Sequence, residues 1–198
     1  TLRYAIDDAR AANMPNDTIK KAIAKGAGGG GGESYERLNY EGYGPAGVAM
    51  LIDILTDNRN RTASDIRTIF SKHGGNLGTA GSVAYLFQSK GSLFVQKPGV
   101  EEEALMAAAL EECADDVVDE GEAWEVVTEP GRFIAVRQAL EAAGFTLENA
   151  ELTMVPTTTV SVLGDDAERV VKLVDALEES DDVQKVYANF EVPDGQLV

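Results

Sequence analysis

The chain has almost none of the side chains from which disulfides and zinc sites are built. Cys113 is the only cysteine and His73 the only histidine among 198 residues. No disulfide can therefore form within the chain, and no Cys/His spacing typical of zinc ligands is present. A single cysteine favours the reducing cytoplasm over a disulfide-stabilised secreted scaffold. We expect a cytoplasmic protein without a metal or another cofactor.

Long hydrophobic runs are also missing. No apolar stretch approaches the ~20 residues that a membrane-spanning helix needs, and the first residues have no signal-peptide pattern. The hydrophobic fraction of 44% is nevertheless typical of a globular protein with a packed core. We expect no membrane partner.

Positive charge is scarce in the second half of the chain. Residues 1–100 carry 12 Lys and Arg against 9 Asp and Glu, whereas residues 101–198 carry 5 against 25. The formal net charge of −17 therefore hides a first half of +3 and a second half of −20. Binding depends on the local field rather than on the total, so the first half remains compatible with nucleic acid. The acidic half is either a solvated surface that aids solubility or a surface for basic proteins.

The first 36 residues are predicted to form a short helical unit. Apolar residues at helical spacing predict a helix over 2–13, which Met14-Pro15 interrupts. A second helix is expected to run to about Lys25, with Asn16 or Asp17 as its N-cap and Gly26 at its end. Two short helices bury little surface, and we expect further chain before Thr1.

A Gly-rich stretch, GAGGGGG at residues 26–32, follows these helices. Its composition is typical of a flexible linker. The alternative is a phosphate-binding loop, which would need Lys followed by Ser or Thr after the last glycine. Glu33-Ser34 stand there instead, so we interpret the stretch as a linker.

From residue 40 onward, short apolar strands alternate with amphipathic helices. Residues 91–155 show the order β-α-β-β-α-β, which is typical of a ferredoxin-like unit, and the flanking segments joined together show it again. Tyr85 and Trp124 are expected in or beside a core, and Met106, Leu110 and Cys113 to be buried. Strands are predicted over 48–55, 82–87, 92–96, 116–119, 123–128, 145–155, 157–162 and 183–190, and helices over 58–73, 101–113, 131–143 and 165–179.

These elements predict an α+β fold with three parts. A partial N-terminal helical domain with its linker occupies residues 1–36. A discontinuous ferredoxin-like α/β sandwich domain combines residues 37–90 with 156–198. An acidic ferredoxin-like domain, residues 91–155, is inserted into it.

The predicted helix 58–73 carries the main candidate site. Its apolar stripe of Thr62, Ala63, Ile66, Ile69 and Phe70 falls within an arc of ~100°, which leaves a polar and mostly cationic face outside. Lys and Arg on such a face can hold phosphates and release counterions. The alternative is an ordinary solvated helix with an Arg61–Asp65 pair. The candidate nucleic-acid-binding residues are Arg59, Arg61, Arg67 and Lys72, together with Lys20, Lys21 and Lys25 on the second N-terminal helix.

The turn after this helix contains Gly74, Gly75 and Gly78. Glycine there can supply left-handed backbone conformations, and the sequence leaves open whether the turn also contacts a ligand. His73 is expected to cap the helix rather than to act in catalysis.

Several segments resemble the YebC/PmpR family of transcriptional and translational regulators, which includes the mitochondrial translational activator of cytochrome c oxidase subunit I. They are YEGYGPAGVAMLIDILTDNRNRTASDIRTIFSKHGGNLGTAGSVAYLF (40–87), ALEECADDVV (109–118), VPTTTV (155–160) and NMPNDTIKKAIAKG (13–26). The resemblance implies three domains with the third inserted into the second. It also implies a preceding segment rich in Lys and Arg.

The resemblance implies a non-enzymatic regulator of gene expression, and two forms of it stay open. One is a transcriptional regulator that binds DNA. The other is a translation factor that contacts rRNA or mRNA on the ribosome, with the acidic half 101–198 facing basic ribosomal proteins. A phosphate-ester enzyme is a remote third possibility, because no nucleophile–base pair is apparent.

Overall fold

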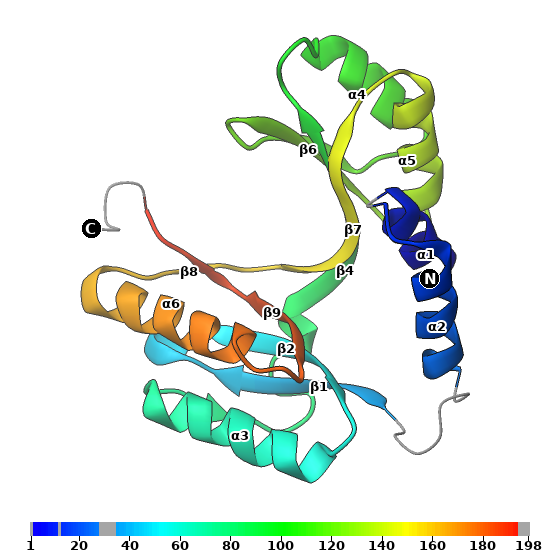
Figure 1. Ribbon diagram of the computed structural model, residues 1–198. Coiled ribbons are helices and arrows are strands. Elements are labelled where there is room, and N and C mark those ends of the chain that lie inside the picture. Colours follow the sequence, from blue (N-terminus) through cyan, green and yellow to red (C-terminus); the bar gives the residue numbers. More distant parts are fainter. Residues whose placement is uncertain (1, 12, 28–34, 194–198) are drawn as a thin grey trace.

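The computed structural model describes residues 2–11, 13–27 and 35–193. It confirms the α+β class: a helical hairpin and two four-stranded antiparallel sheets, each with two helices on one face (Figure 1). Residues 28–32 of the predicted linker lie outside the described residues. No helix among the described residues is long and apolar enough to cross a membrane.

The helical hairpin consists of α1 (Leu2–Ala11) and α2 (Asn16–Gly26). The predicted N-cap was wrong, because Pro15 occupies that position and no side chain caps the helix. Its fixed φ suits the entry into a helix. Ile19 is the buried side chain of α2, and its lysines lie on the exposed side.

The first sheet contains a strand that the sequence pattern does not reveal. Its strand order is β3-β1-β2-β9, and β1 pairs with β2 over its full length from Glu36↔Thr56 to Tyr43↔Ala49. β1 occupies the ferredoxin-like position that the sequence pattern assigns to residues 157–162. The bounds are β1 (Glu36–Tyr43), β2 (Ala49–Thr56), β3 (Asn76–Leu77) and β9 (Val183–Ala188).

Two helices, α3 (Arg59–Lys72) and α6 (Gly164–Glu178), cover one face of this sheet. Their apolar stripes meet the inward residues of β2 in a single core, whose members include Ile52, Ile66 and Leu173, all with no exposed surface. The predicted limits of this helix, 58–73, agree with α3 to within one residue at each end. Thr62, Ile66 and Phe70 are buried, while Ala63 and Ile69 are half-buried.

The second sheet has the order β5-β6-β4-β7, which is the ferredoxin-like order predicted for this unit. Helices α4 and α5 cover one face, with Leu105 and Val136 in their shared core. Met106, Leu110 and Cys113 are exposed, so their predicted burial was wrong. The bounds are β4 (Phe87–Gln96), α4 (Glu102–Glu111), β5 (Asp116–Asp119), β6 (Ala123–Thr128), α5 (Phe133–Ala142) and β7 (Leu147–Pro156).

A long ribbon of β4 and β7 joins the two sheets (Figure 1). The two strands pair from Phe87↔Pro156 to Val95↔Leu147 and so run through the boundaries that the sequence suggested near 90 and 155. The predicted strand 82–87 was wrong, because Ala84–Leu86 form the 3₁₀ helix η2. Only β8 (Val160–Ser161) forms within 157–162, paired with β10 (Phe190–Glu191) outside both main sheets.

Candidate nucleic-acid interface

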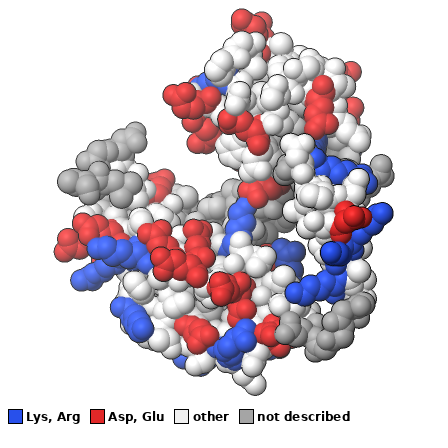
Figure 2. All heavy atoms as spheres, viewed as in Figure 1, with Lys and Arg blue, Asp and Glu red and all other residues white. Residues whose placement is uncertain are grey.

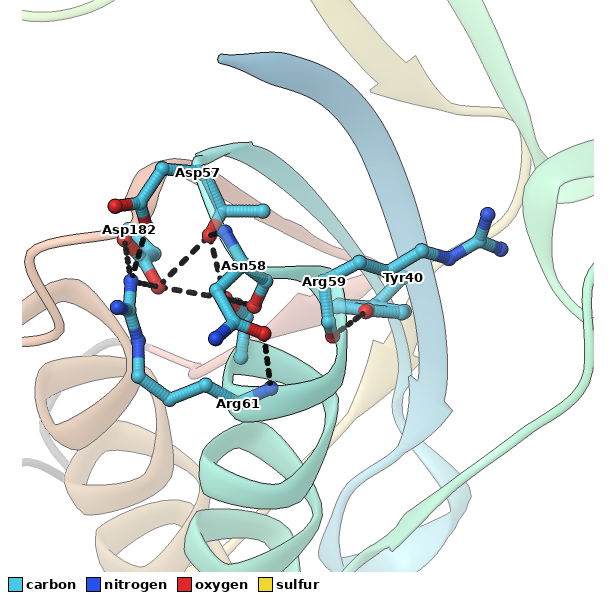
Figure 3. A network of polar contacts seen from close by, with 8 residues as sticks. Tyr40, Asp57, Asn58, Arg59, Arg61 and Asp182 are labelled. Atoms are coloured by element: carbon cyan, nitrogen blue, oxygen red, sulfur yellow. Dashed lines mark hydrogen bonds and ion pairs between the residues drawn. The ribbon is translucent and has the colours of Figure 1, made fainter. Parts of the chain in front are cut away.

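Helix α3 begins at a side-chain cap. Asn58 is its N-cap residue, and its Oδ1 accepts the Arg61 backbone N–H at 3.1 Å. The Asn58 backbone N–H in turn donates to Thr56 Oγ1 at 2.9 Å. These bonds satisfy donors that a helix start leaves without partners. They hold the first turn of α3 against the end of β2 (Figure 3).

The Arg61 side chain turns inward to this cap (Figure 3). Its Nη2 lies 2.8 Å from Asp57 Oδ1 and 3.0 Å from Asp182 Oδ2. Asp182 also accepts the hydroxyl of buried Thr62 at 2.6 Å. The hydrogen bonds that Arg61 donates to Asp182 and Asp57 raise the pKa of Arg61. Two carboxylates therefore compensate the charge of Arg61, which favours a role in the helix cap over phosphate binding.

Asp182 is expected to stabilise the fold through this network. Burial raises the pKa of its carboxyl. The hydrogen bonds from Thr62 and Arg61 lower it and together outweigh burial, so the pKa lies below its usual value. Asp182→Ala should lower the free energy of unfolding by about 2 kcal/mol, the scale for hydrogen bonds to a charged group. Chemical denaturation at pH 7 measures this loss. The neighbouring exposed Asp181→Ala is the control and should change stability by less than about 0.5 kcal/mol.

The acid dependence of this contribution has a definite sign. The folded pKa is lower than the unfolded one of about 3.9, so Asp182 stabilises the protein above that pH. The contribution is lost as the pH falls through the folded pKa. A D182A variant with unchanged stability at pH 7 would contradict the assigned role.

Arg59 lies on the opposite side of the same helical turn and extends away from the cap (Figure 3). Its side chain is 66% exposed, and its Nη1 approaches the carboxylate of Glu36, itself exposed, only to 3.9 Å. The hydroxyl of Tyr40 donates to the Arg59 carbonyl at 3.1 Å, which fixes the backbone rather than the guanidinium. Arg59 is thus available to a ligand.

The other five candidate residues are exposed and uncompensated. Among the described residues the structure shows no ion pair for Arg67 or Lys72 on α3, nor for the lysines of α2. Most cations of the rest of the chain do have carboxylate partners. Those with partners are Arg37, Lys90, Lys97, Arg137, Arg169, Lys172 and Lys185, whereas the candidates Lys20, Lys21, Lys25, Arg67 and Lys72 have none.

Positive and negative side chains gather on different parts of the surface. Figure 2 shows Lys and Arg side chains gathered over the helical hairpin on the right of this face, and Asp and Glu side chains over the upper unit. The upper unit, residues 87–156, has 4 Lys and Arg against 15 Asp and Glu. A polyanion would therefore meet attraction at the hairpin and at α3, and repulsion at the upper unit.

The glycines after α3 serve packing. His73 is the C-cap of α3, as predicted, and Gly74 has a φ of +79°. A Cβ would lie 2.6 Å from the Tyr43 carbonyl oxygen at Gly75 and 2.5 Å from Ser82 Oγ at Gly78. The turn therefore needs glycine for contacts within the chain.

Glu41 on β1 is a buried carboxylate that the sequence pattern does not reveal. It accepts the backbone N–H groups of Gly81, Val83 and Ala84 at 2.6, 2.7 and 2.8 Å. A buried acid needs such donors. Nothing in its local sequence marks Glu41 as buried, because its partners lie about 40 residues away.

Comparison with known proteins places this arrangement in a family. The family description "TACO1/YebC second and third domain" matches residues 35–190. The chain belongs to the TACO1/YebC family. A probable transcriptional regulatory protein of Rubrobacter xylanophilus is 56% identical over 96% of this chain and 77% of its own length. A protein of the same name from Dictyoglomus thermophilum is 52% identical over 98% and 78%.

The TACO1/YebC fold has a solved counterpart. The crystal structure of a conserved hypothetical protein from Aquifex aeolicus matches with a TM-score of 0.88 and 47% identity, over 99% of this chain and 81% of that one. The family match spans α3 but not α2. In the described part of this TACO1/YebC chain, no group of three or more His, Cys, Asp or Glu side chains could hold a metal ion.

Proposed function

We propose that this chain is a cytoplasmic, non-enzymatic regulator of gene expression that binds nucleic acid through α2 and α3. DNA is the first candidate ligand, because the TACO1/YebC relatives are named probable transcriptional regulatory proteins. The exposed cations carry the proposal: Lys20, Lys21 and Lys25 on α2 and Arg67 and Lys72 on α3 are uncompensated, and Arg59 on α3 has only the exposed Glu36 at 3.9 Å. Exposed cations without carboxylate partners are the groups that gain most from phosphate contact.

Salt dependence of binding tests this proposal. The Arg67→Ala/Lys72→Ala double variant should reduce the slope of log K against log salt by about 1 for each phosphate that the protein no longer touches. Fluorescence anisotropy with a labelled duplex measures the slope over a roughly sixfold range of salt, from about 50 to about 300 mM. A Lys20→Ala/Lys21→Ala variant should act in the same direction.

Two single variants serve as matched controls. Arg61→Ala removes a cation that Asp57 and Asp182 already compensate, so the slope should stay close to that of the unchanged chain. Arg132→Ala removes an exposed cation of the acidic unit. If the double variant and the controls share one slope, Arg67 and Lys72 do not contact phosphate.

A translation factor that binds RNA on the ribosome is the second candidate. The acidic unit favours it, since 15 Asp and Glu against 4 Lys and Arg in residues 87–156 suit basic ribosomal proteins better than long duplex DNA. Co-sedimentation with ribosomes at low salt distinguishes the two. Absence from ribosomal fractions together with tight duplex binding would favour transcription.

A further inference from the structure

The first sheet has a second face, which points away from α3 and α6. Its central part is covered by side chains that pack on Ala49 and Leu51, namely those of Val83, Ala84, Leu86, Phe87 and Met154. Alternation along the strands puts Asp53 on the same face as Leu51. Pairing then adds Lys185 opposite Asp53 and Tyr187 opposite Leu51. The open remainder of this face is therefore mostly polar, with Leu55 as an exposed apolar side chain.

Tyr85 stands out from the cover of this face. It lies on η2 and its side chain is 72% exposed, the largest exposed fraction among the large hydrophobic residues that the structure describes. The backbone beneath it is held firmly, because Val83 and Ala84 donate to the Glu41 carboxylate and Leu86 donates to the Val83 carbonyl at 2.9 Å. An aromatic ring is thus presented to solvent from a fixed backbone.

Arg37 and Lys185 lie on the same face with fixed orientations. Arg37 donates through Nε to Asp53 Oδ1 at 2.9 Å and through Nη2 to Asp53 Oδ2, yet its side chain remains 72% exposed. Lys185 Nζ lies 2.5 Å from Glu151 Oε1 and 5.7 Å from the centre of the Tyr187 ring. Each cation has its own carboxylate, so this face contributes shape and oriented donors rather than net charge.

Tyr187 is a half-buried tyrosine on the same side of the sheet. Burial raises the pKa of Tyr187, and the carboxylates of Asp53 and Glu151 raise it further. The phenol therefore stays protonated at neutral pH and can donate a hydrogen bond. The η2 segment that carries Tyr85, the Arg37 side chain and Tyr187 thus lie on one side of the sheet.

We propose that this face binds the unstacked bases of single-stranded RNA, with Tyr85 as the stacking residue and Arg37 as a second planar contact. Single-stranded loops expose base faces, which aromatic rings and guanidinium planes contact, whereas a duplex keeps these faces stacked. The inference rests on the proposed nucleic-acid binding, and it names RNA rather than DNA as the ligand. The sheet face contacts bases and is separate from the phosphate-binding cations of α3, which lie on the other side of the sheet.

The experiment compares the 198-residue chain with Tyr85→Phe and Tyr85→Ala. The probes are a mixed-sequence RNA single strand containing 2-aminopurine, the same sequence as single-stranded DNA, and its duplex. Tyr85→Ala should weaken RNA binding at least about fivefold, since one stacked base contributes that much or more. Tyr85→Phe should retain affinity and 2-aminopurine quenching. Met106→Ala, an exposed apolar residue on α4, is the control and should bind as the unchanged chain does.

The outcomes separate this inference from the proposed function. Equal RNA affinity of Tyr85→Ala and the unchanged chain would overturn the stacking role, even if the α3 variants still reduce the salt slope. Equal weakening by Tyr85→Phe and Tyr85→Ala would also overturn it. Preference for the duplex, or for the DNA strand over the RNA strand, would overturn the choice of ligand. Loss of ribosome binding in Tyr85→Ala with unchanged RNA affinity would assign the face to a protein and overturn the RNA proposal. No binding of any probe would refute both proposals.

Discussion

Replacing Glu41 by alanine is expected to lower the free energy of unfolding by about 3 kcal/mol or more, because each buried donor left without an acceptor costs about 1–3 kcal/mol. The Glu41 carboxylate is buried and accepts three backbone N–H groups from Gly81, Val83 and Ala84. In the alanine variant these three donors are left without the carboxylate. Urea denaturation followed by circular dichroism measures the loss of stability.

The variant Glu41→Gln separates shape from charge. It keeps the side-chain volume but exchanges one acceptor oxygen for a donor, so it should lose less stability than Glu41→Ala and still fall well below the unchanged chain. Glu36→Ala, on the exposed start of the same strand, is the matched control and should stay within about 0.5 kcal/mol. If Glu41→Ala and Glu36→Ala were equally stable, the hydrogen bonds from the three backbone N–H groups to Glu41 would contribute nothing to folding.

Glu41 also gives the protein a predictable acid response. Burial raises the pKa of its carboxyl, but the backbone N–H groups of Gly81, Val83 and Ala84 together outweigh burial, so the pKa lies below its usual value. The stabilisation is therefore complete above the unfolded pKa of about 4.3 and is lost as the pH falls through the folded pKa. In Glu41→Ala this part of the acid dependence should be absent.

Gly75→Ala is the second substitution with a large expected effect. It should lower the free energy of unfolding by about 3 kcal/mol, because the added methyl group overpacks the site. Its Cβ would lie 2.6 Å from the Tyr43 carbonyl oxygen, 2.9 Å from Phe70 Cδ1 and 3.2 Å from Gly44 Cα. Two of these three atoms belong to backbone, so a rotamer change cannot relieve the contact. The turn after α3 and the strand β1 would have to separate.

The neighbouring glycine provides the control for Gly75. Gly74 has room, since the nearest atom to an added Cβ is Pro45 Cγ at 4.0 Å, but its φ is +79°. Gly74→Ala should therefore lower the free energy of unfolding only through the strain of the left-handed conformation, by about 1 kcal/mol. Thermal denaturation of both variants compares the two mechanisms. A smaller loss for Gly75→Ala than for Gly74→Ala would mean that the backbone there yields easily.

Elements built from local patterns could be predicted from the sequence. The helix at 58–73 follows from the spacing of Ile66 and Phe70, and the hairpin of β5 and β6 follows from two short strands around Gly121. β1 could not be found in this way. Its outer residues are polar, and Glu41 is buried only because a distant loop covers it. A strand of this kind is recognised by its partners rather than by its own pattern.

The candidate site shows the same division. The sequence identified the cations of α3, but it suggested Asp65 as the partner of Arg61. The structure instead places Asp57 there and Asp182, 121 residues away. Arg61 therefore changes from a candidate ligand-binding residue to part of the helix cap. Tyr85 changes in the other direction, from an expected core residue to the most exposed aromatic side chain of the second sheet face.

The sequence by itself determined the α+β class, the family, the apolar stripe of α3 and the separation of a mildly basic first half from an acidic second half. These properties depend on residue type and on spacings within one helix or strand. Only the tertiary structure decided which cations are compensated, which strand completes the first sheet and which aromatic ring faces solvent. Those outcomes depend on carboxylates, backbone donors and covering segments that folding brings together from distant positions, and local periodicity contains no information about them.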